Sequence, residues 1–217
     1  MTGKDSFDRA YAEHRRGHWQ SYFRLLKEAA LLGYPEAQGN LGSWYLEGHR
    51  LLPRSPRKGA ELLEAAARSG NALAAFDLGN CYADGLGVSA NAAASRKWLV
   101  RAAQQGVSMA AVNLAVDYRL LGNLRAELRW LRRAMALGDE EATIQLGERA
   151  LANRWSAQLF QPVARELLRL AAPNSQDSAA ARNVLSKAAS QGRLDPWAAA
   201  RLAKMLRIAE SSSASSR

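Results

Sequence analysis

The stretch that decides the fold is residues 74–106, AAFDLGNCYADGLGVSANAAASRKWLVRAAQQG. Its landmarks, in order, are Ala74, Leu78-Gly79, Tyr82, Gly85, Ala102-Ala103 and Gly106. The same order recurs along the chain, and the closing glycines of successive copies are Gly33, Gly70, Gly106 and Gly138. These glycines are spaced by 32 to 37 residues, a period typical of repeat arrays rather than of one globular core.

Each copy has the pattern of a helix pair. With the alanine as origin and 100° per residue, the Ala, Leu, Gly and Tyr at offsets 0, 4, 5 and 8 share one face about 140° wide. The glycine at offset 5 lets a facing helix approach closely, and the closing glycine suits a left-handed helix end. We expect first helices at 36–48, 73–85, 109–121 and 141–153, and second helices at 55–70, 90–106, 123–138 and 160–172.

Residues 74–106 resemble the repeat of the Sel1-like repeat family, a relative of the tetratricopeptide repeat. They match A-x-x-x-L-G-x-x-Y-x-x-G-x-G-V, carry the tryptophan of the family's A-x-x-W at Trp98, and match A-A-x-x-G at Gly106. The copy from Ala37 departs at its turn, and the third copy shortens its turn to Gly122-Asn123. The resemblance covers roughly residues 20–153. It implies an all-α fold, a right-handed α-solenoid of stacked antiparallel helix pairs.

The ends of the chain follow the pattern more loosely. Residues 1–36 read as a degenerate repeat or N-terminal cap, and the polar run from Ser211 to Arg217 has nothing to bury, so we expect disorder there. The segments between are expected to be repeats at 37–73, 74–109 and 110–141, a degenerate repeat at 142–178 and C-terminal capping helices at 179–210.

Acidic and basic residues are distributed differently between the first and the second helices. The net charge is +10, yet the expected first helices hold two bases, Arg119 and Arg149, against seven acids: Glu36, Glu47, Asp77, Asp84, Asp117, Glu141 and Glu148. The second helices hold the excess of bases. No apolar signal core or run of 18 apolar residues occurs in the sequence, so we expect a cytoplasmic protein without membrane insertion.

The resemblance implies that the first helices line a concave groove. The polar residues expected there are Asn40, Ser43, Glu47, Asp77, Asn80, Asp84, Asn113, Asp117, Gln145 and Glu148. Offset 3 is Asn, Asp, Asn and Gln in successive repeats, and such side chains can donate to and accept from a peptide backbone. Carboxylates beside them favour a basic segment. The alternative is that this polar face is simply solvated and that its amides hold the repeats together.

The resemblance also implies that the second helices form the outer face, and its expected basic residues are Arg96, Lys97, Arg101, Arg129, Arg132 and Arg133. It could contact phosphates in a salt-dependent way. Solubility and helix dipoles explain the same residues, and no RNA-binding or helix-turn-helix signature accompanies them, so the sequence disfavours nucleic acid. Trp98 and Trp130 occupy equivalent places in these helices and are expected to pack in the core or between repeats rather than to serve as stacking platforms.

The sequence predicts no catalytic, metal or cofactor site. His14 and His18 are four apart, a helical ligand spacing, but no further ligand residues join them in a motif. Cys81, the one cysteine, is expected to be a small, partly buried residue. Gly85-x-Gly87 is a repeat turn, because it neither follows a strand nor completes a nucleotide fingerprint.

The resulting hypothesis is a non-catalytic scaffold or adaptor that binds a partner protein, as a peptide or a domain with basic character, in the groove. One alternative is a dedicated inhibitor or immunity-type protein that caps a single partner. Another is a binder of nucleic acid or acidic proteins through the basic face. The sequence leaves the partner, the pathway and the oligomeric state open.

The register of the repeat can be tested at its leucine. Leu78→Ala should lower the free energy of unfolding by about 2–5 kcal/mol, because a buried leucine loses its contacts and leaves a cavity. Denaturant unfolding followed by circular dichroism measures the change. A change near zero would contradict the proposed register.

Overall fold

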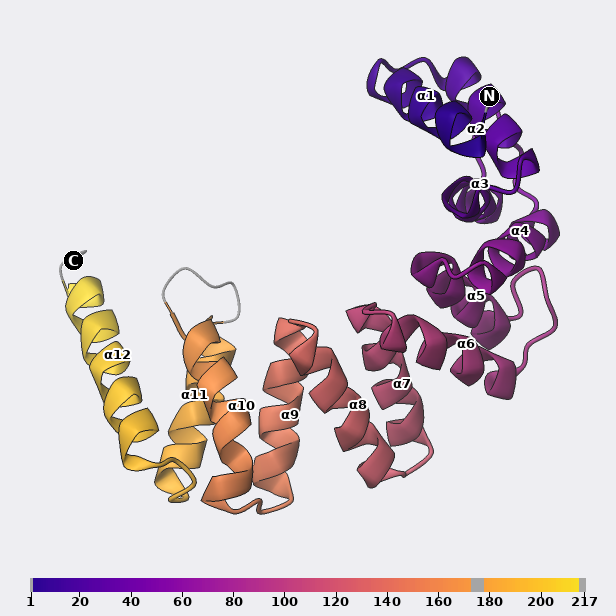
Figure 1. Ribbon diagram of the computed structural model, residues 1–217. Helices are drawn as coiled ribbons and strands as arrows, with labels where there is room; N and C mark the ends of the chain where they lie inside the picture. Colours follow the sequence, from indigo (N-terminus) through magenta and orange to yellow (C-terminus); the bar gives the residue numbers. More distant parts are fainter. Residues whose placement is uncertain (1, 173–177, 215–217) are drawn as a thin grey trace. The chain divides into compact units, whose positions relative to one another are not determined.

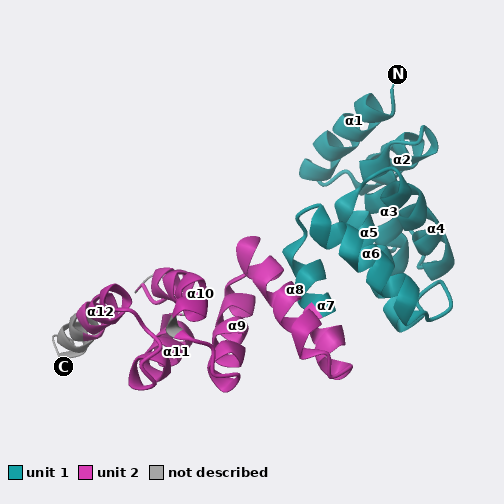
Figure 2. Ribbon diagram, turned by 60° about the horizontal axis from the view of Figure 1, so that its bottom comes forward, with its two compact units in different colours: residues 1–114 teal, residues 115–217 magenta. Residues whose placement is uncertain are grey.

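The computed structural model describes residues 2–172 and 178–214, and these residues form twelve helices (Figure 1). The chain divides into two compact units, residues 1–114 and residues 115–217 (Figure 2). Unit 1 holds α1 (Gly3–Arg15), α2 (Trp19–Leu31), α3 (Pro35–Glu47), α4 (Pro56–Arg68), α5 (Ala72–Asp84), α6 (Ala92–Gln104) and the first half of α7 (Ser108–Leu120). Unit 2 continues with α8 (Leu124–Ala136), α9 (Glu140–Ala152), α10 (Ala157–Leu170), α11 (Ser178–Ser190) and α12 (Pro196–Ala214).

Helices pack as pairs within each unit. In unit 1, α1 packs on α2, α3 on α4 and α5 on α6, while α2 contacts α3 and α4 contacts α5. In unit 2, α9 lies against both α8 and α10, and α10 packs on α11. The prediction of an all-α solenoid of stacked helix pairs is therefore confirmed. Within the described residues, no helix is both long enough and apolar enough to cross a membrane.

Asparagine and aspartate side chains start several of the helices. Asn71, Asn91, Asn123 and Asp139 each accept a hydrogen bond from the backbone N–H three residues later, over 2.9 to 3.1 Å. Each side chain thus satisfies one of the N–H groups that the first turn of a helix leaves without a partner. These caps fix the observed starts, so α6 begins at Ala92, two residues later than expected.

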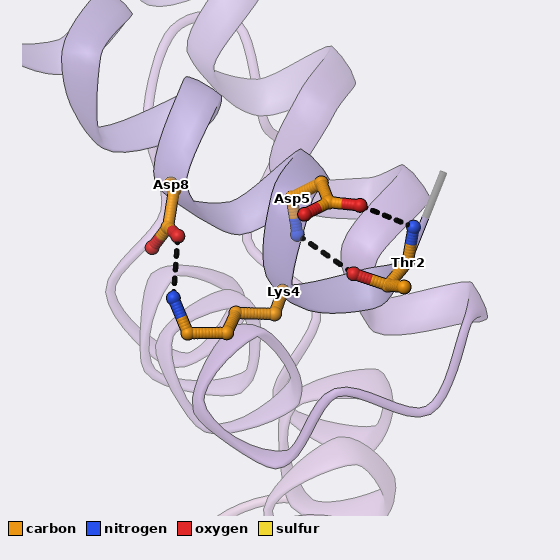
Figure 3. Close-up of polar contacts among 4 residues, drawn as sticks. All are labelled: Thr2, Lys4, Asp5 and Asp8. Atoms are coloured by element: carbon orange, nitrogen blue, oxygen red, sulfur yellow. Dashed lines mark hydrogen bonds and ion pairs between the residues drawn. The ribbon is translucent and has the colours of Figure 1, made fainter.

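The N-terminal helix has a reciprocal cap (Figure 3). The backbone N–H of Asp5 donates to Thr2 Oγ1 over 3.2 Å, and the Thr2 N–H donates to Asp5 Oδ2 over 2.7 Å. The hydrogen bond from the Thr2 backbone lowers the pKa of Asp5. Lys4 and Asp8 form an ion pair one turn further along. This capping box gives α1, the first helix of the degenerate repeat, a defined start.

The closing glycines end the second helices as predicted. Gly70 and Gly106 have φ values of +98° and +102°. The N–H after each glycine donates to the first alanine of the preceding pair, from Asn71 to Ala66 over 3.0 Å and from Val107 to Ala102 over 3.1 Å. This is the Schellman pattern of hydrogen bonds. It places the glycine outside the helix, so α4 and α6 end two residues earlier than the sequence pattern suggests.

The glycine at offset 5 sits where the two helices of a pair are closest. A Cβ on Gly42 would lie 2.9 Å from Leu63 Cγ and 3.0 Å from the Gly59 carbonyl oxygen. A Cβ on Gly79 would lie 2.8 Å from Leu99 Cγ. The distances to the two leucine Cγ atoms are shorter than real Cβ atoms show, so a side chain at either glycine would force a shift. The pairs α3/α4 and α5/α6 therefore depend on glycine for their close approach, as the sequence predicts.

The predicted apolar stripe forms the core. The alanines and leucines at offsets 0 and 4 are all buried: Ala37, Leu41, Ala74, Leu78, Ala110, Leu114, Ala142 and Leu146. The second helices contribute Leu63, Leu99 and Leu131 to it. Trp130 is buried and Trp98 is half-buried, which agrees with a packing role for both.

The C-terminal helix extends further than the sequence suggests. α12 continues to Ala214, so the first four residues of the segment expected to be disordered are helical. Residues 215–217 lie outside the described residues.

The turn between α5 and α6 allows a direct test of the repeat pattern. Gly87 has a φ of +75°, and a Cβ there would lie 2.1 Å from the Pro56 carbonyl oxygen at the start of α4. Gly87→Ala should lower the free energy of unfolding by about 2 kcal/mol or more, since backbone strain and a backbone clash add together.

Gly106→Ala is the matched control, because Gly106 also has a positive φ but no atom within 4 Å of an added Cβ. It should lower the free energy of unfolding by only about 1 kcal/mol. Thermal and urea unfolding compare the two variants. Equal losses would mean that the turn does not pack on α4.

Candidate protein-binding groove

The ten residues expected in the groove all lie on first helices. In unit 1, α3 carries Asn40, Ser43 and Glu47, α5 carries Asp77, Asn80 and Asp84, and α7 carries Asn113. In unit 2, α7 carries Asp117 and α9 carries Gln145 and Glu148. Glu47, Asp84 and Glu148 are exposed, and the other seven are half-buried. We call the polar side chains of α3, α5 and α7 in unit 1 the first-helix surface.

Neighbouring first helices are joined by hydrogen bonds between polar side chains. Ser43 Oγ on α3 donates to Asp77 Oδ2 on α5 over 2.7 Å. Asn113 Nδ2 on α7 donates to Asn80 Oδ1 on α5 over 3.0 Å. Each bond joins offset 6 of one repeat to offset 3 of the next. The amides and hydroxyls of this face therefore do connect the repeats, as the alternative interpretation of the sequence holds.

We call these hydrogen bonds between neighbouring first helices the polar ladder. It extends toward the N-terminus, and its hydrogen-bond pattern changes toward the C-terminus. Asn40 Nδ2 on α3 donates to the Tyr11 hydroxyl on α1 over 3.3 Å. In the fourth repeat, offset 3 is Gln145, and offset 6 of the third repeat is Val116, which cannot accept a hydrogen bond. Gln145 instead donates to Glu141 on its own helix over 2.9 Å. The polar ladder is thus a property of unit 1.

Asp77, one of the carboxylates expected in the groove, lies in surroundings that shift its pKa. Burial raises its pKa, and the nearby charge of Glu47 raises it further. The hydrogen bond from Ser43 lowers the pKa, but it does not outweigh burial. A carboxylate that is costly to ionise in its own fold is one that a cation from outside can stabilise.

The basic outer face takes part in the internal packing. Arg101 donates to the Arg68 carbonyl oxygen over 3.3 Å and Gln105 to the Gly70 carbonyl oxygen over 3.2 Å, both at the C-terminal end of α4. Cations also lie over aromatic rings, Arg129 over Trp130 at 5.2 Å and Arg132 over Trp155 at 4.5 Å. Arg96 and Arg133 are half-buried, and Lys97 is exposed. Part of this charge therefore stabilises the fold.

Sequence reasoning missed an ion pair in unit 2. Arg149 on α9 lies 2.8 Å from Glu127 on α8, whose side chain is 6% exposed. Arg149 is one of the two bases of the expected first helices, and this pair holds it against the second helix. A buried carboxylate needs such a partner.

The sequence also gives little sign of an aromatic pocket at the N-terminal end of the first-helix surface. A cavity of about 300 Å³ is lined by Tyr11, His14, Tyr22, Asn40, Ser43, Trp44 and Glu47. In the sequence, the aromatic residues between positions 7 and 33 indicate a degenerate repeat and do not reveal a pocket. Trp44 falls between the positions that define the repeat pattern. The pocket depends on how α1 and α2 pack against α3.

The cysteine and the two N-terminal histidines lie in surroundings that do not favour reactivity or metal binding. Cys81 is buried, and burial raises the pKa of its thiol to about 11, which disfavours the reactive thiolate. His18 precedes α2 and bonds Glu13, while His14 is on α1, so the two histidines do not share a helix. Among the described residues, no group of three His, Cys, Asp or Glu side chains is placed to hold a metal ion.

Two segments of the chain match a known repeat. The sequence model of the Sel1 repeat matches residues 35–71 and 72–107, which hold α3 with α4 and α5 with α6. A curated relative, chitin synthase regulatory factor 3 of Schizosaccharomyces pombe, is 35% identical over 79 residues. These residues are 36% of this chain and 8% of that protein, so the chain spans less than a tenth of the relative's length.

Two solved structures have a similar fold. The Sel1 repeat protein of Oxalobacter formigenes has a TM-score of 0.61 and 22% identity over 87% of this chain and 84% of that one. A protective antigen of uropathogenic Escherichia coli strains, described as displaying an SLR fold, has a TM-score of 0.66 and 24% identity. That match covers 95% of this chain and 49% of the antigen. At these identities the likeness concerns the fold.

The environment of Asp77 predicts how stability depends on pH. Its raised pKa means that the folded protein holds this proton more tightly than the unfolded chain does. Stability therefore falls as the pH rises from the ordinary aspartate value of 3.8 through the raised folded value. Asp77→Asn should increase the free energy of unfolding at pH 7, and the increase should vanish near pH 3.

Urea unfolding at the two pH values measures this effect, with Asp84→Asn, an exposed position on the same helix, as the control. The amide that replaces Asp77 still accepts the Ser43 hydrogen bond. A loss of stability at pH 7 would show that the carboxylate is a structural requirement rather than a strained group.

Proposed function

We propose that this chain, two segments of which match the Sel1 repeat, is a non-catalytic adaptor that binds a basic segment of a partner protein on the first-helix surface. Sel1-repeat proteins generally mediate protein–protein interactions, which supports this class of function. The polar face of α3, α5 and α7 supports the choice of this surface and of a partner with basic charge. Within unit 2, Asp117, Gln145 and Glu148 are proposed as further partner-binding residues.

The environment of Asp77 carries the proposal. Its carboxylate is half-buried on α5, it holds one hydrogen bond from Ser43, and the charge of Glu47 acts on it. A lysine or arginine of a bound segment would offset the burial and the repulsion together. Such complementarity acts chiefly on association rate and on the choice of partner.

The ladder amides can bind the backbone of the segment. A side-chain amide has two N–H groups and a carbonyl oxygen with two lone pairs. Asn80 and Asn113 share one hydrogen bond with each other, which leaves each of them further donors and acceptors. The ladder can therefore hold the repeats together and bind a peptide with the same residues.

The observations favour this surface over the basic outer face. Arg101, Arg129 and Arg132 make contacts within their own unit, whereas Glu47 and Asp84 project from the first helices as exposed carboxylates. A dedicated inhibitor of one protein would use the same first-helix surface. It differs from an adaptor in forming a single tight one-to-one complex.

The proposal predicts that a charge reversal on α5 abolishes partner binding. The tagged chain is used for affinity purification from nuclease-treated lysate at physiological salt, alongside Asp77→Lys combined with Asn80→Ala. Proteins recovered with the unaltered chain should be lost with the double variant, because a cation replaces the carboxylate that a basic segment requires. Helical circular dichroism of both chains should agree.

Lys97→Glu combined with Arg129→Glu is the matched control on exposed positions of the second helices, and it should retain the partner. Binding that survives the α5 substitutions, or that is lost only with the outer-face substitutions, would contradict the proposal. Recovery that requires nucleic acid or low salt would instead assign the function to the basic face.

A further inference from the structure

We propose that the aromatic pocket of unit 1, lined by Tyr11, His14, Tyr22, Trp44 and Glu47, binds the side chain of one lysine or arginine of the partner segment. The inference rests on the proposed function and names the residue type that anchors the segment at its end near α1. The cavity of about 300 Å³ is at the lower end of the volumes that ligand pockets have, roughly 300–1,000 Å³.

Aromatic rings from three helices form the pocket walls. Tyr11 and His14 on α1 have ring centroids 6.2 Å apart, and His14 lies 4.9 Å from Tyr22 on α2. Tyr22 in turn lies 6.5 Å from Trp44 on α3. Aromatic rings that line one pocket can attract a cation through their negative π faces.

Hydrogen bonds hold the walls in place. Trp44 Nε1 donates to the Tyr22 hydroxyl over 3.0 Å, and Asn40 Nδ2 donates to the Tyr11 hydroxyl over 3.3 Å. Tyr22 is buried, whereas Tyr11 is 44% exposed, so Tyr11 is the ring that an incoming side chain can reach first. Walls fixed before binding reduce the ordering that a ligand would otherwise have to impose.

The charge of the pocket selects a cation. Its lining includes the exposed carboxylate of Glu47 and no lysine or arginine. Glu47 also acts electrostatically on Asp77, so the pocket adjoins the carboxylate at the centre of the proposed binding surface. An aliphatic side chain would gain the apolar contacts of the rings but would lose this charge pairing.

The test uses N-acetyl-arginine amide and N-acetyl-lysine amide as probes, added to the full-length, ¹⁵N-labelled chain. The Trp44 indole N–H resonance should shift in a saturable way with both. N-acetyl-citrulline amide, a neutral analogue of the arginine probe, should leave it unshifted at the same concentration and ionic strength. Glu47→Gln should weaken arginine binding about three- to tenfold, and Tyr11→Leu by a similar factor.

Glu61→Gln, at an exposed acid on α4, is the control and should leave the probe affinity unchanged. The pocket proposal is overturned if the citrulline and arginine probes shift Trp44 equally, or if Glu47→Gln binds arginine as tightly as the unaltered chain. It is also overturned if no probe shifts Trp44.

The pocket and the adaptor proposal can fail separately. A partner lost on Asp77→Lys together with an unresponsive Trp44 resonance rejects the pocket and keeps the first-helix surface. A saturable, charge-dependent shift of Trp44, with partner capture unaffected by Asp77→Lys, keeps the pocket and rejects the adaptor surface on α5.

Discussion

The close approach of two helices at a glycine is the constraint from which the rest of unit 1 follows. Gly42 and Gly79 sit where a single additional carbon would collide with Leu63 or Leu99 of the paired helix. This contact buries the small and apolar face of each first helix against the paired helix. The opposite face is left to polar residues, and their spacing along the helix decides which of them meet the next repeat.

The polar face has a structural and a binding role at once. Offset 6 of one repeat meets offset 3 of the next, as Ser43 meets Asp77 and Asn80 meets Asn113. These bonds fix neighbouring repeats without using the full hydrogen-bonding capacity of the side chains. They also hold the Asp77 carboxylate in surroundings that penalise its charge. A buried carboxylate that lowers the stability of the fold is typical of binding sites, where a ligand supplies the missing partner.

The local rules of the fold are readable in the sequence because they depend on residues close together in the chain. The alanine and leucine stripe predicts the buried face, and the closing glycines mark the helix ends. The pairing of Ser43 with Asp77 and the grouping of Tyr11 with Trp44 depend on how successive helices pack, which no local pattern encodes. The same reason explains why Arg101, expected on the basic outer face, and Arg149, counted only among the bases of the first helices, make contacts between helices.

Carboxyl footprinting of the chain with and without its captured partner tests the central claim most directly, because it labels the acidic side chains themselves. With the partner bound, Glu47 and Asp84 on the first helices should be protected from carbodiimide-driven labelling, while Glu61 and Glu64 on α4 should label as in the free chain. Protection of the α4 residues with continued labelling of Glu47 and Asp84 would contradict the account.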